Sequence, residues 1–138
     1  MSASLWERMA NKRARPAYWK DDPDEHDYPA AGDYLSLLFP ERVGAALVEE
    51  LRSASIVRRK AKDLIRASRL PLLPADNPEV AKDLRRVAKG ESLSPVLIVR
   101  GQATAGVPML VADGYHRICA SYHLDEDTDI PCRIAELA

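Results

Sequence analysis

The chain has 138 residues, of which 46% are hydrophobic and 30% are charged, so it is long enough for one globular domain with a core and too short for two of ordinary size. Its 20 Lys and Arg residues nearly balance its 21 Asp and Glu residues, which excludes a general positive field that would hold the protein on DNA or on an anionic membrane. No apolar run approaches the roughly 18 residues of a membrane-spanning helix, and the N-terminus lacks the apolar stretch of a signal peptide. We therefore expect a cytoplasmic protein without a membrane partner.

The two cysteines, Cys119 and Cys132, stand outside any Cys-x-x-Cys or Cys/His cluster of the kind that binds zinc. A structural disulfide between them would be unusual in a reducing compartment. We expect both to be small buried apolar residues without a redox role, and we predict no metal site built from Cys and His residues.

The first residues have the character of a docking arm. Residues 2–15 show a weak helical pattern, and the aromatic residues Trp6, Tyr18 and Trp19 are candidate anchors. Such residues either bind a partner, which would be a second copy of the chain or another protein, or fold back on their own domain.

An acidic, proline-interrupted segment, residues 20–27, follows this arm. It contains four Asp, one Glu and His26, but it lacks the glycine turn and the ligand spacing of a calcium loop, so we expect a solvated surface linker. Apolar residues then recur at three- and four-residue intervals between Tyr28 and Ser53. This spacing predicts two short packed helices, the second beginning at Pro40.

A third helix is predicted over residues 56–68, and it is rich in basic side chains. These are Arg58, Arg59, Lys60, Lys62 and Arg66. A basic face this dense is usually exposed to solvent, and the alternative is contact with phosphate or with an acidic partner.

Five elements are predicted from Asp76 onward, in the order helix, strand, strand, helix, strand. Residues 76–79 offer an N-cap followed by a proline in the first helical turn. The elements are a helix over 78–89, the two strands of a hairpin over 96–99 and 109–112, a helix over 117–124 and a strand over 130–134. The fold class is therefore α+β.

The turn between the second of these strands and the following helix is the predicted functional site. A strand that ends in a glycine turn and begins a helix leaves backbone N–H groups unpaired, with the positive end of the helix dipole behind them. Gly114 allows close approach of an anion, Arg117 adds a forked cation, and His116 adds a donor that titrates near neutral pH. We expect Asp113 to cap the helix or to hold a metal ion. The alternative is structural, with a cap, a turn and surface ion pairs.

The residues around this turn resemble the signature of the ParB/sulfiredoxin superfamily. The matching segments are Leu110 to Tyr122, with its Gly-Tyr-His-Arg core, the strand 130–134, the helix from Pro78 to its stop at Gly90, and the polar-Pro-hydrophobic segment 93–100. The resemblance spans about 70–137, half of the chain. It implies a ParB/sulfiredoxin-like core, a small mixed sheet with helices over 55–138, preceded by an N-terminal helical extension over 1–54.

In that family the His-Arg turn and the preceding helix bind nucleotide phosphates. The resemblance thus implies phosphate contacts by Gly114, His116 and Arg117, and the apolar register of the preceding helix adds Lys82 and Arg86. For this last pair the alternative is a solvated basic helix face. The implied cofactors are ATP or CTP with Mg²⁺, and the candidate catalytic residues are His116 and Asp113.

Three departures from the family pattern restrict the activity. Tyr115 stands where sulfiredoxins have their cysteine, and Cys119 lies a helical turn further on, so we expect no sulfinic acid reductase. No helix-turn-helix follows the last strand of this sequence, so we do not expect centromere binding. Asp-Gly-Tyr-His-Arg is similar at four of five positions to the Asp-Gly-His-His-Arg turn of a free-serine kinase branch, but no acidic base for an acceptor hydroxyl is identified.

Three functional hypotheses follow. The first is a nucleotide-binding protein, an NTPase or a small-molecule kinase, acting at the turn of residues 113–117. The second is a DNA-associated or nuclease-like module that uses the basic segment of residues 58–66. The third is a non-catalytic interaction protein that retains the fold and binds a protein partner, or another copy of itself, through the N-terminal arm.

Overall fold

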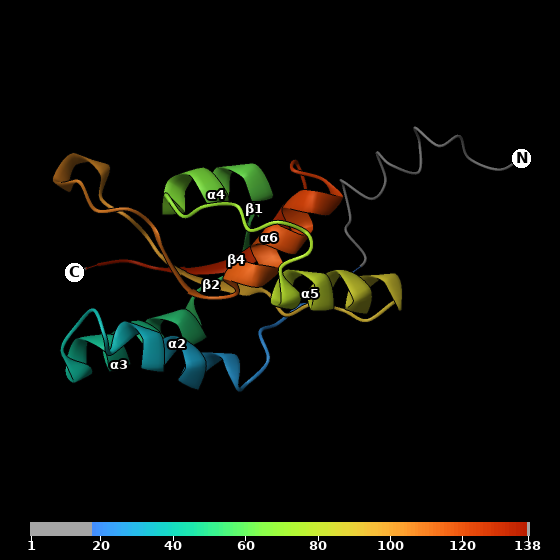
Figure 1. Cartoon of the computed structure of the whole chain (residues 1–138). Helices are drawn as coiled ribbons and strands as arrows, with labels where there is room; N and C mark the ends of the chain where they lie inside the picture. Colours follow the sequence, from blue (N-terminus) through green and yellow to red (C-terminus); the bar gives the residue numbers. More distant parts are fainter. Residues whose placement is uncertain (1–17, 138) are drawn as a thin grey trace, which may run out of the picture.

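The computed structural model describes residues 18–137, which form helices on both faces of a four-stranded sheet (Figure 1). The elements are α2 (Asp27–Leu35), α3 (Glu41–Ser53), β1 (Val57–Lys60), α4 (Ala61–Ser68), α5 (Pro78–Ala88), β2 (Val96–Val99), the 3₁₀ turn η1 (Ala103–Ala105), β3 (Leu110–Asp113), α6 (Tyr115–Leu124) and β4 (Asp129–Ala135). The α+β class and the element order predicted from Asp76 onward are confirmed. None of the helices within residues 18–137 combines the length and the hydrophobicity that a membrane-spanning helix needs.

The sheet is mixed, with the strand order β1-β4-β2-β3. Strands β2 and β3 form the predicted antiparallel hairpin, in which Leu97 is opposite Asp113 and Val99 is opposite Leu110. Strand β4 runs parallel to β2 and antiparallel to β1. All four residues of β2 are buried, as expected for an uninterrupted Val-Leu-Ile-Val run that is covered on both faces.

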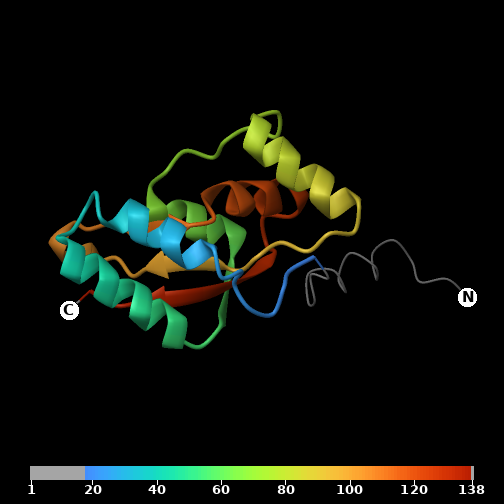
Figure 2. The ribbon, with the colours of Figure 1, turned by 90° about the horizontal axis from the view of Figure 1, so that it is seen from below.

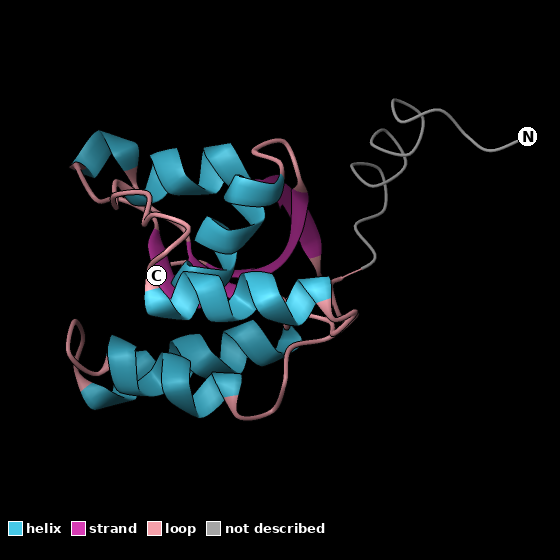
Figure 3. Cartoon of the chain, turned by 45° about the vertical axis from the view of Figure 1, so that its right-hand side comes forward, coloured by secondary structure: helices cyan, strands magenta, loops and turns pink. Residues whose placement is uncertain are grey.

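Each face of the sheet has its own apolar core. On one face, Leu97 and Val99 pack with buried residues of α2 and α3, and Figure 2 shows these two helices lying across the sheet. On the other face, Val96 and Ile98 pack with α4 and α6. Helix α5 adds a further layer against α6 through Val80. The strands therefore lie between two groups of helices, as Figure 3 shows.

The two predicted helices between Tyr28 and Ser53 are confirmed as α2 and α3. Their leucines Leu35 and Leu51 are fully buried in the same core as the sheet residues Leu97 and Val99. Burial of a leucine side chain contributes roughly 1.5–3 kcal/mol, so these helices contribute substantially to covering the sheet.

The predicted helix over residues 56–68 is wrong in its first part. Val57 to Lys60 form β1, which pairs with β4, and the helix begins only at Ala61. The partner strand lies about seventy residues further along the chain: Val57 is opposite Cys132. A local pattern cannot reveal such a partner, and the ladder of backbone hydrogen bonds overrides the helical tendency of the basic residues.

The expectation of a solvated linker over residues 20–27 is also wrong at its end, because Asp27 is buried. Its carboxylate accepts a hydrogen bond from the hydroxyl of Ser94, and that hydroxyl accepts one from the N–H of Asp24 at 2.9 Å. A buried carboxylate requires such partners. The end of the acidic segment is therefore held against Ser94.

Two of the three aromatic residues of the arm fold back on their own domain. Trp19 is buried in the core and forms an isolated parallel bridge with Leu93. The hydroxyl of Tyr18 lies 2.9 Å from that of Ser121, and its carbonyl accepts a hydrogen bond from the N–H of Leu93. Trp6 and the remainder of the arm lie outside the described residues.

Both cysteines are free and buried, as the sequence predicts. Burial raises the pKa of the Cys119 thiol, and it raises the pKa of Cys132 to about 12. Both side chains are therefore protonated at neutral pH and pack as apolar groups.

Candidate functional site

The predicted site forms where β3 ends and α6 begins. Gly114 has a φ of +110° at the N-cap position of α6. A Cβ at this position would lie 2.5 Å from Cγ1 of Val96 and 2.9 Å from Nη2 of Arg117. The sharp turn therefore requires glycine for its backbone conformation and for its close contact with β2.

The first backbone N–H groups of α6 are available at this turn. Ile118 donates the first intrahelical bond, to the carbonyl of Gly114, at 3.0 Å. The preceding N–H groups, of Tyr115, His116 and Arg117, have no acceptor within residues 18–137. The positive end of the helix dipole lies at the same turn, and anion binding by these donors stays a prediction.

Asp113 does not cap the helix, which corrects the predicted capping role. The N-cap residue is Gly114, and no side chain among the described residues caps α6. The Asp113 carboxylate instead pairs with Arg117 one helical turn later, with 3.0 Å between Oδ2 and Nη2. The reason is geometric: the αL conformation of Gly114 places Asp113 before the cap, where its side chain lies beside that of Arg117.

Arg117 is shared between two carboxylates from distant parts of the chain. Its Nη2 also lies 3.6 Å from Oδ2 of Asp27 and 3.4 Å from the carbonyl oxygen of Pro95. The Arg117 side chain is 17% exposed and that of Asp27 is 4% exposed, so these charges are largely removed from water. When both carboxylates are ionised, this one guanidinium faces two negative charges, and the next potential cation is the His26 ring, whose Nε2 lies 3.4 Å from Oδ1 of Asp27.

Helix α5 brings a further carboxylate, Asp83, toward the turn. Burial raises the pKa of Asp83, whereas the charges of Arg117, Arg86 and His116 lower it. Nη1 of Arg86 lies 3.8 Å from Oδ1 of Asp83. The predicted residue Arg86 therefore lies between Asp83 and Glu91, and its contact with phosphate stays a prediction. Lys82 is exposed on α5, and its contact with phosphate stays a prediction.

Burial also raises the pKa of Asp113, and the neighbouring carboxylate of Asp27 raises it further, while Arg117 lowers it. In the adjoining acidic segment, Lys20 lies 2.8 Å from Asp24 and holds the pKa of that carboxyl below its usual value. Asp24, His26 and Asp27 each place a ligand atom within 4.8 Å of the others, an arrangement that acidic segments also adopt without a metal.

The aromatic residues of the turn lie side by side. The rings of Tyr115 and His116 are 5.7 Å apart, and the Tyr115 hydroxyl donates a hydrogen bond to the carbonyl of Pro71. Tyr115 thus ties the segment before α5 to the start of α6. Cys119 lies one turn further along α6, buried and protonated, and it offers no thiolate to the site.

Asp27 and Asp83 are the site residues that the sequence predictions missed. Asp83 has a detectable signal, because it lies on the same helix face as Val80, Leu84 and Val87, where a carboxylate is unexpected. Asp27 has no local signal, since it reaches Arg117 only through the folding of α2 onto the sheet.

The basic segment around α4 is partly neutralised. Lys62 lies 2.7 Å from Asp127, Lys60 lies 3.9 Å from the same carboxylate, and Arg66 lies 3.8 Å from Asp63. Paired cations are less available to a DNA backbone, so this surface gives the DNA hypothesis less support than the sequence count of basic residues does.

Comparison of the chain with protein-family models, with curated proteins and with solved structures found no match. The resemblance to the ParB/sulfiredoxin superfamily therefore rests on its motif residues.

Proposed function

We propose that the turn of residues 113–117 binds the phosphates of a nucleotide, ATP or CTP, together with Mg²⁺. The observation that carries this proposal is the sharing of Arg117 by Asp27 and Asp113 beside the free N–H groups of α6. Donors for phosphate and an excess of carboxylate charge thus lie next to each other.

These two features favour a metal–phosphate complex over a free phosphate. Carboxylates repel a bare triphosphate, but Mg²⁺ is commonly held by one or two carboxylates together with phosphate oxygens. The N–H groups at the start of α6 then take the phosphate oxygens, and Arg86, which pairs with Asp83 on α5, is a further candidate cation. In this arrangement Arg117 positions Asp27 and Asp113, which modifies the direct phosphate contact implied by the family resemblance.

Turnover would make the protein a nucleotide hydrolase or a phosphotransferase. His116 is the candidate acid–base group because it lies at the start of α6 beside the phosphate donors, and Asp113 is the candidate metal-holding carboxylate. Release of inorganic phosphate from MgATP and MgCTP, compared between the wild type and a His116→Asn variant, tests this role. Activity that is equal in both proteins would remove His116 from it.

Calorimetric titration of the full chain with ATP, CTP and ADP tests the binding proposal. We expect saturable binding below about 1 mM with Mg²⁺, and affinity at least about tenfold lower when EDTA removes the metal, a difference of about 1.4 kcal/mol. Absence of saturable binding to all three nucleotides at millimolar concentration, or affinity that is the same with and without Mg²⁺, would contradict it.

An Asp113→Asn variant sharpens this experiment. The substitution leaves Arg117 paired with Asp27 alone, which is charge-balanced, so we expect the fold to remain intact. The Mg²⁺ dependence of binding should then be lost. Asp63→Asn is the matched control, because it removes one carboxylate from α4, away from the turn, and it should leave nucleotide binding unchanged.

A further inference from the structure

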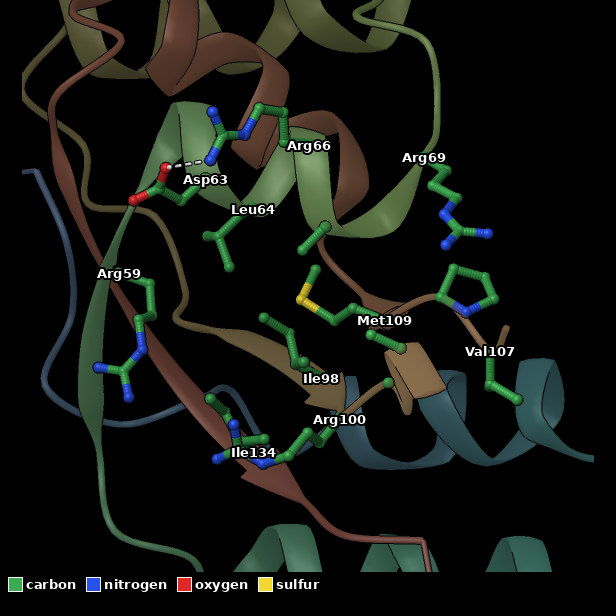
Figure 4. Close-up of a pocket in the computed structure, with 14 residues that line it drawn as sticks. Arg59, Asp63, Leu64, Arg66, Arg69, Ile98, Arg100, Val107, Met109 and Ile134 are labelled. Atoms are coloured by element: carbon green, nitrogen blue, oxygen red, sulfur yellow. Dashed lines mark ion pairs between the residues drawn. The ribbon is translucent and has the colours of Figure 1, made fainter. Parts of the chain in front are cut away.

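A cavity of about 430 Å³ lies at the opposite end of the β2–β3 hairpin from the turn of residues 113–117. It lies between α4, the ends of β2 and β4, and the connection between β2 and β3 (Figure 4). Its volume falls within the roughly 300–1,000 Å³ range of cavities that bind small molecules. None of the residues predicted for nucleotide binding lines it.

The centre of the cavity is apolar. Leu64 of α4, Ile98 of β2 and Met109 point into it, with Ile134 of β4 beside them (Figure 4). Leu64 and Ile98 belong to the buried core, so the cavity opens directly onto that core. A concave apolar surface of this kind gains free energy when an apolar group replaces the water in it.

Four arginines surround this apolar centre. They are Arg59, Arg66, Arg69 and Arg100, and Figure 4 shows them on different sides of it. Arg66 lies 3.8 Å from Asp63, and Arg100 lies 2.7 Å from Glu136. Within residues 18–137, Arg59 and Arg69 have no carboxylate partner, and Asp63 is the one acidic residue of the lining. The cavity therefore carries an excess of positive charge.

The backbone at Arg69 supports a role for its side chain. Arg69 follows the last residue of α4 with a φ of 59°, the left-handed conformation in which glycine or asparagine is usual after a helix. It is the one residue other than glycine with a positive φ among residues 18–137. An arginine here is less favourable for the backbone than glycine, and what it adds is a guanidinium at the edge of the cavity.

We infer that this cavity binds a small organic anion: an apolar body, alkyl or aryl, that carries a carboxylate or phosphate-monoester head. The apolar body occupies the centre lined by Leu64, Ile98 and Met109, and the head pairs with Arg59 or Arg69. Guanidinium groups suit both kinds of head because they donate two parallel hydrogen bonds, and they also stack on flat apolar groups. The inference is independent of nucleotide binding at the turn.

Titration of the full chain with three naphthalene probes tests the inference. The probes are 2-naphthoate, 2-naphthyl phosphate and the neutral 2-naphthamide. We expect saturable binding of at least one anion below about 1 mM, and affinity for the amide lower by about tenfold or more. The better of the two anions identifies the preferred head group. Equal affinity for the amide, or no saturation by either anion, would overturn the inference.

Arginine variants locate the bound head group. Arg59→Gln and Arg69→Gln are exposed substitutions that should leave the fold intact, and at least one should weaken anion binding by about tenfold while amide binding stays unchanged. Arg85→Gln, an exposed position on α5, is the matched control and should have no effect. An equal loss in the control, or displacement of the bound naphthoate by MgATP, would overturn the assignment to this cavity.

Discussion

At one end of the β2–β3 hairpin two carboxylates share a single guanidinium, whereas at the other end four arginines surround an apolar cavity with one acidic residue in its lining. The chain as a whole has a formal net charge of only −1. Overall charge therefore excludes a general field, but it does not exclude two local fields of opposite sign on one small sheet.

The two ends also differ in how deeply their charges are buried. Asp27 and Arg117 are 4% and 17% exposed, so each depends on the other for compensation. The cavity arginines Arg66 and Arg100 are 86% and 53% exposed and remain solvated. Charge removal should consequently be costly for stability at the turn and nearly free at the cavity.

The largest expected effect is that of Arg117→Met. Removal of the guanidinium leaves Asp27 and Asp113 facing each other without the cation that they share, and we expect a loss of about 3 kcal/mol in the free energy of unfolding. Urea denaturation at neutral pH measures this loss. The deficit should shrink as the pH falls, because burial raises the pKa of Asp113 and protonation of that carboxyl group removes its repulsion with Asp27.

Arg100→Gln serves as the control for this substitution. It removes an arginine from an exposed ion pair with Glu136, which should contribute at most about 1 kcal/mol. If both variants lost the same stability, the contrast in burial between the two ends of the hairpin would be wrong.

The next effect is that of Gly114→Ala, which combines a strained backbone with a steric clash. The added Cβ would lie 2.5 Å from Val96, so the substitution should cost about 2 to 3 kcal/mol. Gly90→Ala is the comparison, since Gly90 has a φ of +82° and no atom of residues 18–137 lies within 4 Å of the added atom; it should cost about 1 kcal/mol. Equal thermal unfolding midpoints for the two variants would show that the contact with β2 is unimportant.

At the cavity, Arg69→Gly should change stability and binding in opposite directions. Glycine relieves the left-handed conformation at the end of α4, so we expect up to about 1 kcal/mol of added stability. Loss of the guanidinium should at the same time weaken naphthoate binding. Unfolding curves and titrations of one preparation measure both effects, and unchanged affinity would mean that Arg69 does not contact the anion.

The smallest expected effect is a pH dependence of opposite sign at two aspartates. Burial raises the folded-state pKa of Asp83 above its ordinary 3.8, so its stabilising contribution is present below that value and is lost as the pH rises through the folded pKa. Asp83→Asn should therefore be more stable than the wild type at neutral pH, with the difference vanishing as the pH falls toward 3.8.

Asp24 should behave in the opposite way, because Lys20 lowers its pKa. Its contribution is present above the ordinary pKa and is lost as the pH falls through the folded value. Asp24→Asn should be less stable than the wild type at neutral pH and should approach it in acid. Thermal unfolding between pH 3 and pH 7, expressed as the difference from the wild type, should separate the two variants; parallel pH profiles would contradict the assignment.

Local sequence signals predicted much of this fold. The N-cap and the proline after it predict the start of a helix at Pro78. The structure confirms this start, because the Asn77 side chain accepts hydrogen bonds from the N–H groups of Glu79 and Val80. The two strands of the hairpin were equally predictable from their own residues. Strand β1 was not, because it is defined by pairing with β4 rather than by its own residues.

The candidate site was only half predictable. The residue types of the turn 113–117 predict a functional site there. The pairing of Arg117 with Asp27 of α2 could not be predicted, because it depends on long-range packing. The cavity was even harder to predict from the sequence, because its arginines come from β1, from α4 and from the segments that follow α4 and β2. The sequence of the basic segment predicts a positively charged surface. Only the fold shows that these charges lie around an apolar cavity.

Chemical-shift mapping on the ¹⁵N-labelled full chain tests most directly that the two ends of the hairpin bind different ligands. MgADP, which avoids turnover, should shift the amides of Gly114 to Arg117, and the tighter-binding of the two naphthyl anions should shift those around Arg69 and between residues 98 and 109. The two sets should remain separate when both ligands are present. Shifts by both ligands at the same end of the hairpin, or by neither ligand at either end, would contradict the separation of a carboxylate site from an arginine site.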